Sequence, residues 1–174
     1  EEMKMAQIPA AQVSAVTVFL IDDYQAFLKQ QDWITEHVKQ GARAIFLELA
    51  PEETYDIAGS RVDVKCSSMS PLHFVSRDTG HEMAKGFRPE DFRLWYDPAA
   101  DSITPFLFNT FTAENFTAVL KSGNTNSQGE WGPALAVGER KCGRGSIFVC
   151  QINLTGRTST NPVAKMFACR LLQI

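Results

Sequence analysis

Apolar and polar positions follow two different periods in the first part of the chain. Val13 to Ile21 and Ala42 to Leu49 are near-continuous apolar runs, the pattern of strands that are buried on both faces. Between them, Tyr24 to Gln40 repeats apolar residues at helical spacing and stops before Gly41, a residue that favours helix ends. Strand, helix and strand together predict a βαβ unit with a right-handed crossover.

The rest of the chain gives one further strong strand and several weaker ones. Ser146 to Leu154 is strongly apolar, and Asn161-Pro162 predicts the start of a last helix that runs to about Leu172. Pro51 to Glu53 suits the first turn of a short helix, with Pro at the first position and acids near the N-terminus. Weaker strands are predicted at Arg61 to Cys66, Ile103 to Phe111, Phe116 to Leu120 and Ala134 to Glu139.

Strands that alternate with helices predict a single three-layer α/β domain, residues 1–174, with a mostly parallel sheet. Ser122 to Glu130 is polar and short, so we expect a surface loop there and not a domain linker. Lys141 to Gly145 lacks the phosphate-loop pattern and leads into a strand, which predicts a hairpin turn. Because the chain opens almost directly on an inner strand, we expect it to be a piece of a longer polypeptide.

Composition narrows the class of protein. The chain has 174 residues, of which 44% are hydrophobic and 21% charged, as in ordinary globular domains. The formal net charge of −3 argues against a nucleic-acid partner. We also expect no membrane partner, because no apolar run reaches about 18 residues, and no signal peptide, because the N-terminus lacks a basic and apolar leader. None of this indicates a cellular compartment.

Two segments carry a resemblance to a known family. The first is H-F-V-S-R-D-T-G-H-E-M-A-K-G-F-R-P-E-D-F-R-L-W, His73 to Trp95, and the second is the tail from Gly143 to Leu172. Both resemble the C-terminal regions of bacterial glycoside hydrolase family 2 enzymes, the β-galactosidase and β-glucuronidase group. The resemblance implies a class I glutamine amidotransferase-like, flavodoxin-like domain from about Val16 to the end of the chain. It also implies a role in carbohydrate metabolism for the parent protein.

The chemistry of such a domain needs a nucleophile on a tight strand-to-helix elbow, with a histidine and an acid to activate it. The best place for that elbow reads Leu47-Glu48-Leu49-Ala50-Pro51, without a cysteine or a flanking glycine. Cys66 lacks flanking glycines and Cys150 lies inside a predicted strand. We therefore predict no catalytic residue and no cofactor. The four cysteines are too few for a disulfide scaffold, and we expect buried or inert thiols.

Several polar residues remain as candidates for binding. Asp22 and Asp23 end the first predicted strand, where α/β folds place ligands, although N-capping of the helix at Tyr24 is the favoured explanation. Asp78 and His81 could ligate a metal, but no third ligand stands at a workable spacing, so structural roles are favoured for them and for Arg77.

Arg157 follows the last predicted strand and could anchor an acidic partner or tie its loop. Trp95 and Trp131 belong to an aromatic-rich middle section, which suits sugar stacking, core packing or docking on neighbouring domains. In an excised domain, docking is favoured over sugar binding.

Three functions follow as hypotheses. The favoured one is a non-catalytic accessory domain of a glycoside hydrolase, which packs against other domains of the parent chain or supports a homo-oligomer. The second is a small free-standing α/β hydrolase or transferase with a site at Asp22, Asp23, Arg77 and His81. The third is a carbohydrate-binding module that uses Trp95 and Trp131.

Overall fold

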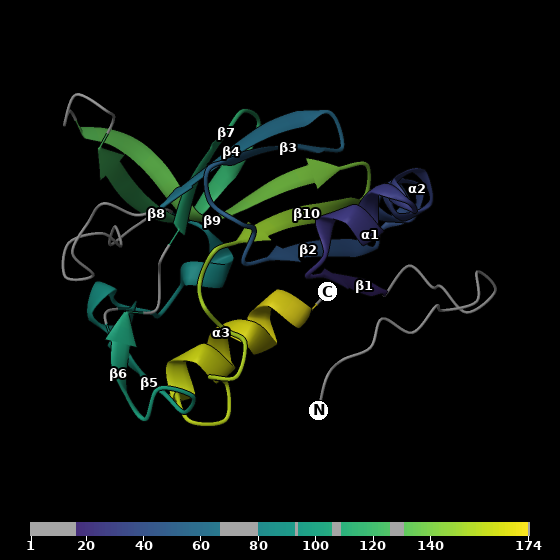
Figure 1. Cartoon of the computed structure of the whole chain (residues 1–174). Coiled ribbons are helices and arrows are strands. Elements are labelled where there is room, and N and C mark those ends of the chain that lie inside the picture. Colours follow the sequence, from purple (N-terminus) through teal and green to yellow (C-terminus); the bar gives the residue numbers. More distant parts are fainter. Residues whose placement is uncertain (1–16, 67–79, 93, 106–108, 126–130, 174) are drawn as a thin grey trace.

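The computed structural model describes residues 17–66, 80–92, 94–105, 109–125 and 131–173. These residues form a main sheet of eight strands, a separate two-stranded sheet, three α-helices and two short 3-10 helices (Figure 1). The path through the main sheet is β1-β2-β10-β9-β7-β4-β3, and β8 pairs with β9 off this path.

The parallel part of the sheet consists of its first three strands. β1 (Val18–Ile21) and β10 (Gly145–Cys150) each run parallel to β2 (Arg43–Leu47). The helices α1 (Tyr24–Leu28) and α2 (Gln31–Gln40) connect β1 to β2, which confirms the predicted order of strand, helical segment and strand. The single predicted helix is interrupted between Leu28 and Gln31. β1 lies at an edge of the sheet and is half-buried, so the prediction of an inner strand buried on both faces is wrong there. The last helix, α3 (Pro162–Leu172), begins and ends as predicted.

Helices cover both faces of this parallel part. On one face Ile34 and Val38 of α2 pack in a core cluster with Phe46 and Val149. On the other face Phe167 and Leu171 of α3 pack in a second cluster with Ile45 and Phe148, and Figure 1 shows α3 beneath the sheet. All eight of these side chains are less than 9% exposed, so β2 and β10 are buried from both sides. This burial explains why their sequences are almost continuously apolar.

The remaining strands are antiparallel. β9 (Trp131–Cys142) pairs with β10, with β8 (Thr117–Thr125) and with β7 (Asn109–Ala113). β7 then pairs with β4 (Ser60–Cys66), and β4 with β3 (Glu53–Ile57). The predicted three-layer, mostly parallel α/β fold is therefore wrong. The protein is mostly β, with a mixed, mainly antiparallel and strongly curled half-barrel sheet and few helices.

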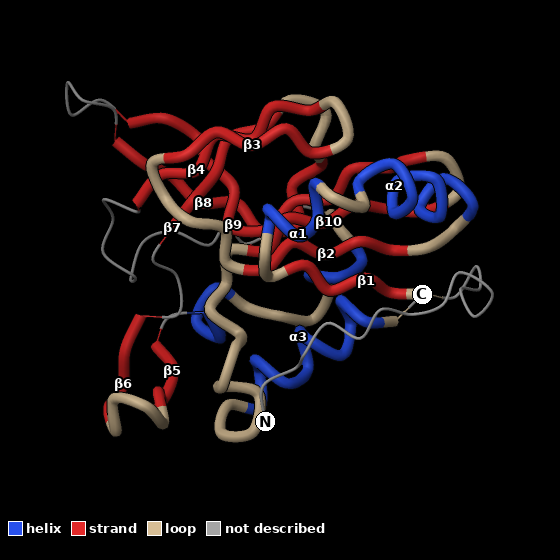
Figure 2. The backbone as a smooth tube through the Cα atoms, turned by 45° about the vertical axis from the view of Figure 1, so that its right-hand side comes forward, coloured by secondary structure: helices blue, strands red, loops and turns tan. Residues whose placement is uncertain are grey.

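The curl brings the two edges of the main sheet towards each other around α1. Tyr24 is the first residue of α1, which follows β1 at one edge, and its hydroxyl bonds to the backbone of Asp56 in β3 at the other edge. The hydroxyl donates to the Asp56 carbonyl oxygen at 2.8 Å and accepts from the Asp56 N–H at 3.0 Å. The Tyr24 ring also packs edge-on against Tyr55, with centroids 4.8 Å apart. Figure 2 shows β3 and β1 on either side of the first helices.

Two local predictions fail in the antiparallel part. Pro51 to Glu53 is not a helix start, because Glu52 has a φ of +59° and Glu53 begins β3. The predicted single strand Ile103 to Phe111 spans parts of two strands, β6 (Ser102–Pro105) and β7, and residues 106–108 between them lie outside the described part. The predicted loop at Ser122 to Glu130 is strand as far as Thr125, and residues 126–130 also lie outside it.

The predicted hairpin turn at Lys141 to Gly145 is confirmed, and it joins the two parts of the sheet. Gly143 has a φ of +61°, which matches a primed two-residue turn between β9 and β10. The turn lies against the C-terminal end of α2, where the N–H of Arg144 donates to the Lys39 carbonyl at 2.9 Å. A Cβ on Gly145 would overlap the carbonyl oxygens of Ala42 and Val38, so this position requires glycine.

The two-stranded sheet stands apart from the main sheet (Figure 1). It consists of β5 (Leu94–Asp97) and β6, paired antiparallel. The 3-10 helices at Glu82–Ala84 and Pro89–Phe92 precede it and contribute Met83 and Phe92 to the cluster under α3. No helix in the described residues is long and apolar enough to cross a membrane.

Candidate functional site

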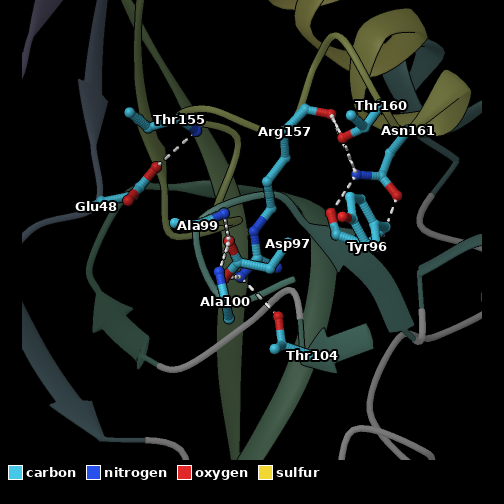
Figure 3. A network of polar contacts seen from close by, with 10 residues as sticks. All are labelled: Glu48, Tyr96, Asp97, Ala99, Ala100, Thr104, Thr155, Arg157, Thr160 and Asn161. Atoms are coloured by element: carbon cyan, nitrogen blue, oxygen red, sulfur yellow. Dashed lines mark hydrogen bonds and ion pairs between the residues drawn. The ribbon is translucent and has the colours of Figure 1, made fainter. Parts of the chain in front are cut away.

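Two buried side chains fasten the β5–β6 hairpin to the loop that precedes α3 (Figure 3). Arg157 is 3% exposed, and its Nη2 donates to the Asp97 carboxylate and to the Thr104 hydroxyl, each at 2.7 Å. The Asn161 side chain pairs with the backbone of Tyr96 as a neighbouring strand would. Its Oδ1 accepts from the Tyr96 N–H at 2.9 Å, and its Nδ2 donates to the Tyr96 carbonyl at 2.8 Å.

The charge on Asp97 is well stabilised. Partial burial acts to raise the pKa of its carboxyl group, but the backbone N–H groups of Ala99 and Ala100 and the Arg157 guanidinium outweigh it and hold the pKa below its usual value. The ion pair is therefore charged at neutral pH. The nearby loop is also tied to the end of β2, because the Thr155 N–H donates to the Glu48 carboxylate at 3.1 Å (Figure 3). Of the two roles considered for Arg157, the structure supports the tie within the chain.

This fastening leaves an apolar face pointing outwards. Leu94, Tyr96 and Ile103 are 48%, 38% and 67% exposed, and Tyr96 lies directly opposite Ile103 in the strand pairing. Alternate residues of the hairpin point inwards, so Trp95 is only 4% exposed and its indole N–H donates to the Asp91 carbonyl at 3.0 Å. The hairpin therefore presents an apolar outer face on a backbone that two buried side chains hold in place.

A second polar cluster surrounds a buried carboxylate in β9. Glu139 is 7% exposed, and its carboxylate accepts from Ser146 Oγ at 2.5 Å and from Lys141 Nζ at 2.6 Å. His81 Nε2 lies 2.9 Å from its other oxygen. Burial acts to raise the pKa of Glu139, but the hydrogen bonds from Lys141, Ser146 and His81 outweigh burial, so the pKa lies below its usual range. This carboxylate is ionised at neutral pH.

The cluster contains a serine, a histidine and an acid, but their order is not that of a catalytic triad. A triad places the imidazole between the hydroxyl and the carboxylate, so that the imidazole can take the hydroxyl proton. Here the Glu139 carboxylate lies between Ser146 and His81. The other imidazole nitrogen, Nδ1, accepts from the Met83 N–H at 3.2 Å and caps a 3-10 helix. The geometry therefore matches a structural network.

The candidate site at Asp22, Asp23 and His81 is not assembled. Asp23 is the N-cap of α1, and its Oδ1 accepts from the Ala26 N–H at 3.0 Å, which confirms the capping explanation. Asp22 is exposed at the end of β1. His81 instead contacts β9, which is three strand spacings from β1, or roughly 14 Å. Arg77 and Asp78 lie outside the described residues.

The two tryptophans give no described sugar platform. Trp95 is 4% exposed and belongs to the core cluster under α3, so its ring is not open to a sugar. Trp131 begins β9, but its side chain lies outside the described part.

The cysteines differ in burial. Cys150 is fully buried within β10, and burial raises the pKa of its thiol to about 12, which disfavours the reactive thiolate. Cys66 and Cys169 are exposed and Cys142 is half-buried, so of the four thiols expected to be buried or inert only Cys150 is fully buried. In the described ranges, no group of three or more His, Cys, Asp or Glu side chains is placed to hold a metal ion.

Comparison with known proteins adds no relative. No protein-family model, no curated protein and no solved structure matches the chain.

Asn161, Asp97, Glu139 and Ser146 all carry central contacts that the sequence analysis does not identify. Asn161 had a visible signal, because Asn before Pro suggests a helix cap, but its amide caps nothing and binds Tyr96 instead. Glu139 had a weaker signal, as a charged residue in an apolar run. Its partners come from positions up to 58 residues away, which no local pattern reports.

Proposed function

We propose that this chain is a non-catalytic accessory domain of a carbohydrate-processing protein, and that it docks on another domain of that protein through the outer face of the β5–β6 hairpin. The observation that carries the proposal is that the backbone of the hairpin is held in place while the apolar side chains on its outer face are exposed. Arg157 and Asn161 fix the hairpin from behind, while Leu94, Tyr96 and Ile103 remain exposed in front.

Physical chemistry favours docking for such a face. An ordered apolar surface loses little conformational entropy on binding, because its backbone is already held in place. Aromatic and aliphatic side chains in a compact patch are typical of the centre of protein interfaces. The hairpin lies within or next to the segment His73 to Trp95, whose resemblance to glycoside hydrolase family 2 proteins supports the class of parent protein.

An enzymatic role has less support. The Ser146 hydroxyl is buried, and the Glu139 carboxylate that accepts its hydrogen bond has a lowered pKa, which makes it a weak base. The Cys150 thiol is buried with a raised pKa, so neither group has the properties of an activated nucleophile. A carbohydrate-binding role would need an exposed aromatic platform, and Tyr96 alone among the hairpin's aromatic residues offers one, beside the Asp101 carboxylate.

The test measures binding of the 174-residue chain to the glycoside hydrolase domain that is encoded in frame with it, by calorimetry on the purified pair. We expect Ile103→Lys to weaken binding at least tenfold, because it places a charge at the centre of the patch. Met166→Lys is the matched control, since Met166 is 52% exposed on α3, away from the hairpin pairing.

Equal binding by wild type and Ile103→Lys would contradict docking through this face. Turnover of aryl-glycosides or glutamine by the isolated chain would contradict the non-catalytic assignment. Binding of oligosaccharides that is lost in Tyr96→Ala would replace the docking role with a carbohydrate-binding one.

A further inference from the structure

In the described residues the path through the main sheet ends at the edge strands β1 and β3, while β8 lies off this path and pairs with β9. The two end strands of the path differ in whether their outward backbone N–H and C=O groups are covered. An edge strand presents unpaired N–H and C=O groups, which can pair with a strand of another chain. Natural proteins guard such edges with charges, with bulges or with a covering side chain.

The β3 edge is guarded in two ways. Its sequence, E-T-Y-D-I, carries exposed acids at Glu53 and Asp56. The outward N–H and C=O of Asp56 are both bonded to the Tyr24 hydroxyl, as described above. An added strand would therefore have to displace Tyr24 and face two carboxylates.

The β1 edge has neither protection. Its sequence, V-F-L-I, has no charge, no proline and no irregular register. The Thr17 carbonyl accepts from the Arg43 N–H, so Thr17 points towards β2, and alternation makes Val18 and Leu20 point away from it. In the described residues β1 pairs with β2 alone, and the outward groups of Val18 and Leu20 have no partner.

We propose that β1 pairs antiparallel with β1 of a second copy of this chain. Outward-pointing residues must face each other in such a pair. The register with the most hydrogen-bonded pairs within β1 sets Val18 opposite Leu20 and places the two-fold axis at Phe19. Every opposed pair within β1 is then apolar. The same self-pairing of β3 would bring the acids of both copies to one edge, so charge selects β1 over β3.

Side chains beside β1 would enlarge the contact between the two copies. A pair of four-residue strands is small for an interface, so side chains above and below the sheet must contribute. The C-terminal end of α3 lies beside β1 in both backbone views (Figures 1 and 2). Leu172 at this end is 47% exposed. A β1 pair would cover it together with the half-buried side chains of Val18 and Leu20.

This proposal does not rest on the function proposed above, because it uses a different surface. Sedimentation equilibrium on the 174-residue chain over a wide concentration range tests it. We expect a concentration-dependent dimer whose dissociation constant rises at least tenfold in Val18→Pro, which removes one outward N–H and leaves the β2 ladder intact. Thr54→Pro, at an outward position of β3, is the matched control and should dimerise as wild type does.

Circular dichroism and thermal unfolding establish that each variant is folded. Should Val18→Pro fail to fold, Leu172→Glu gives the same test from the exposed flank and should also weaken the dimer. A wild type that stays monomeric overturns the proposal. Pairing of β1 with a strand of a different protein, without a dimer of this chain, also overturns it. The proposal is also overturned if Val18→Pro or Leu172→Glu is folded and dimerises with the same dissociation constant as wild type. Ile103→Lys should not affect dimerisation, which keeps the two proposals separable.

Discussion

The strands of the parallel and antiparallel parts of this protein differ in how many of their faces are buried. β2 and β10 lie between α2 on one face and α3 on the other, so almost every side chain along them is apolar. β3 and β4 are covered on one face only, so buried and exposed residues alternate, as in Tyr55 and Ile57 against Thr54 and Asp56. The parallel part is therefore held by packing on two sides, whereas the antiparallel part depends more on its turns and on single polar contacts.

The hairpin between β9 and β10 joins the two parts, and its disruption should have the largest effect. Gly145→Ala places a Cβ against the backbone carbonyl oxygens of Ala42 and Val38, which cannot move without shifting the end of α2. We expect a loss of about 4 kcal/mol in the free energy of unfolding, measured by urea denaturation.

Gly59→Asn is the control for that substitution. Gly59 lies in the β3–β4 turn with a φ of +75° and open space around it, and Asn tolerates this conformation, so we expect a loss below about 1 kcal/mol. Equal losses in the two variants would show that the contact with α2 does not matter.

Arg157→Met should destabilise the β5–β6 hairpin more than either part of the main sheet. The change removes two hydrogen bonds that the buried Arg157 side chain donates, at a cost of about 2 kcal/mol in the free energy of unfolding. Hydrogen exchange should accelerate in β5 and β6 and remain slow in β2 and β10.

Arg61→Met is its matched control. The Arg61 side chain is 72% exposed in its ion pair with Asp63, so we expect a loss of no more than about 0.5 kcal/mol. Uniform acceleration of exchange across the whole chain in Arg157→Met would contradict a local role for Arg157.

Glu139→Gln tests the polar network on β9 through its pH dependence. The folded-state pKa of Glu139 lies below its unfolded value of about 4.3, so the folded state binds this proton less readily. The stabilisation is complete above that pH and is lost as the pH falls through the lower folded pKa. The free energy of unfolding of wild type should exceed that of the variant by about 2 kcal/mol at pH 7, and the gap should shrink as the pH falls below about 4.3.

Urea denaturation across this pH range measures the gap, and Glu36→Gln is the control. Glu36 forms an exposed pair with Lys39, so its replacement should change stability little at any pH. A gap for Glu139→Gln that stays constant with pH would contradict a role for its charge.

Asp23→Ala should give the smallest of these effects, within the parallel part. It removes the N-cap of α1 and should cost about 1 kcal/mol in thermal or urea unfolding. Asp22→Ala, at the exposed neighbour, should stay within about 0.5 kcal/mol of wild type. Equal effects of the two changes would remove the support for capping.

Sequence reasoning succeeded where local patterns carry the information. The strands β1, β2 and β10, the last helix and the glycine-rich turn were all predicted near their observed positions. The segment between β1 and β2 was predicted as one helix and consists of two. It failed for the short helix at Pro51 and for the strand across residues 103–111, because β3, β6 and β7 are short and carry turn-forming residues at their ends.

The contacts of the candidate site also fall into those that local sequence predicts and those that it does not. Asp23 as a cap follows from the residues next to it in the chain. The contacts of Arg157 with Asp97 and of Asn161 with Tyr96 join positions 60 and 65 residues apart, so no local pattern predicts them.

The sequence alone identified β2 and β10 as segments that are buried from two sides, because only such segments need apolar residues at every position. It predicted the same for β1, which instead lies at an edge of the sheet with three half-buried side chains. It also determined where α1 and α3 begin and where the glycine-rich turn between β9 and β10 lies. The tertiary structure decided which strand pairs with which, and with that the curl of the sheet, the guarded and open edges and the outward face of the β5–β6 hairpin. The physical reason is that strand pairing uses backbone groups that every residue carries, so the choice of partner depends on the fold of the whole chain.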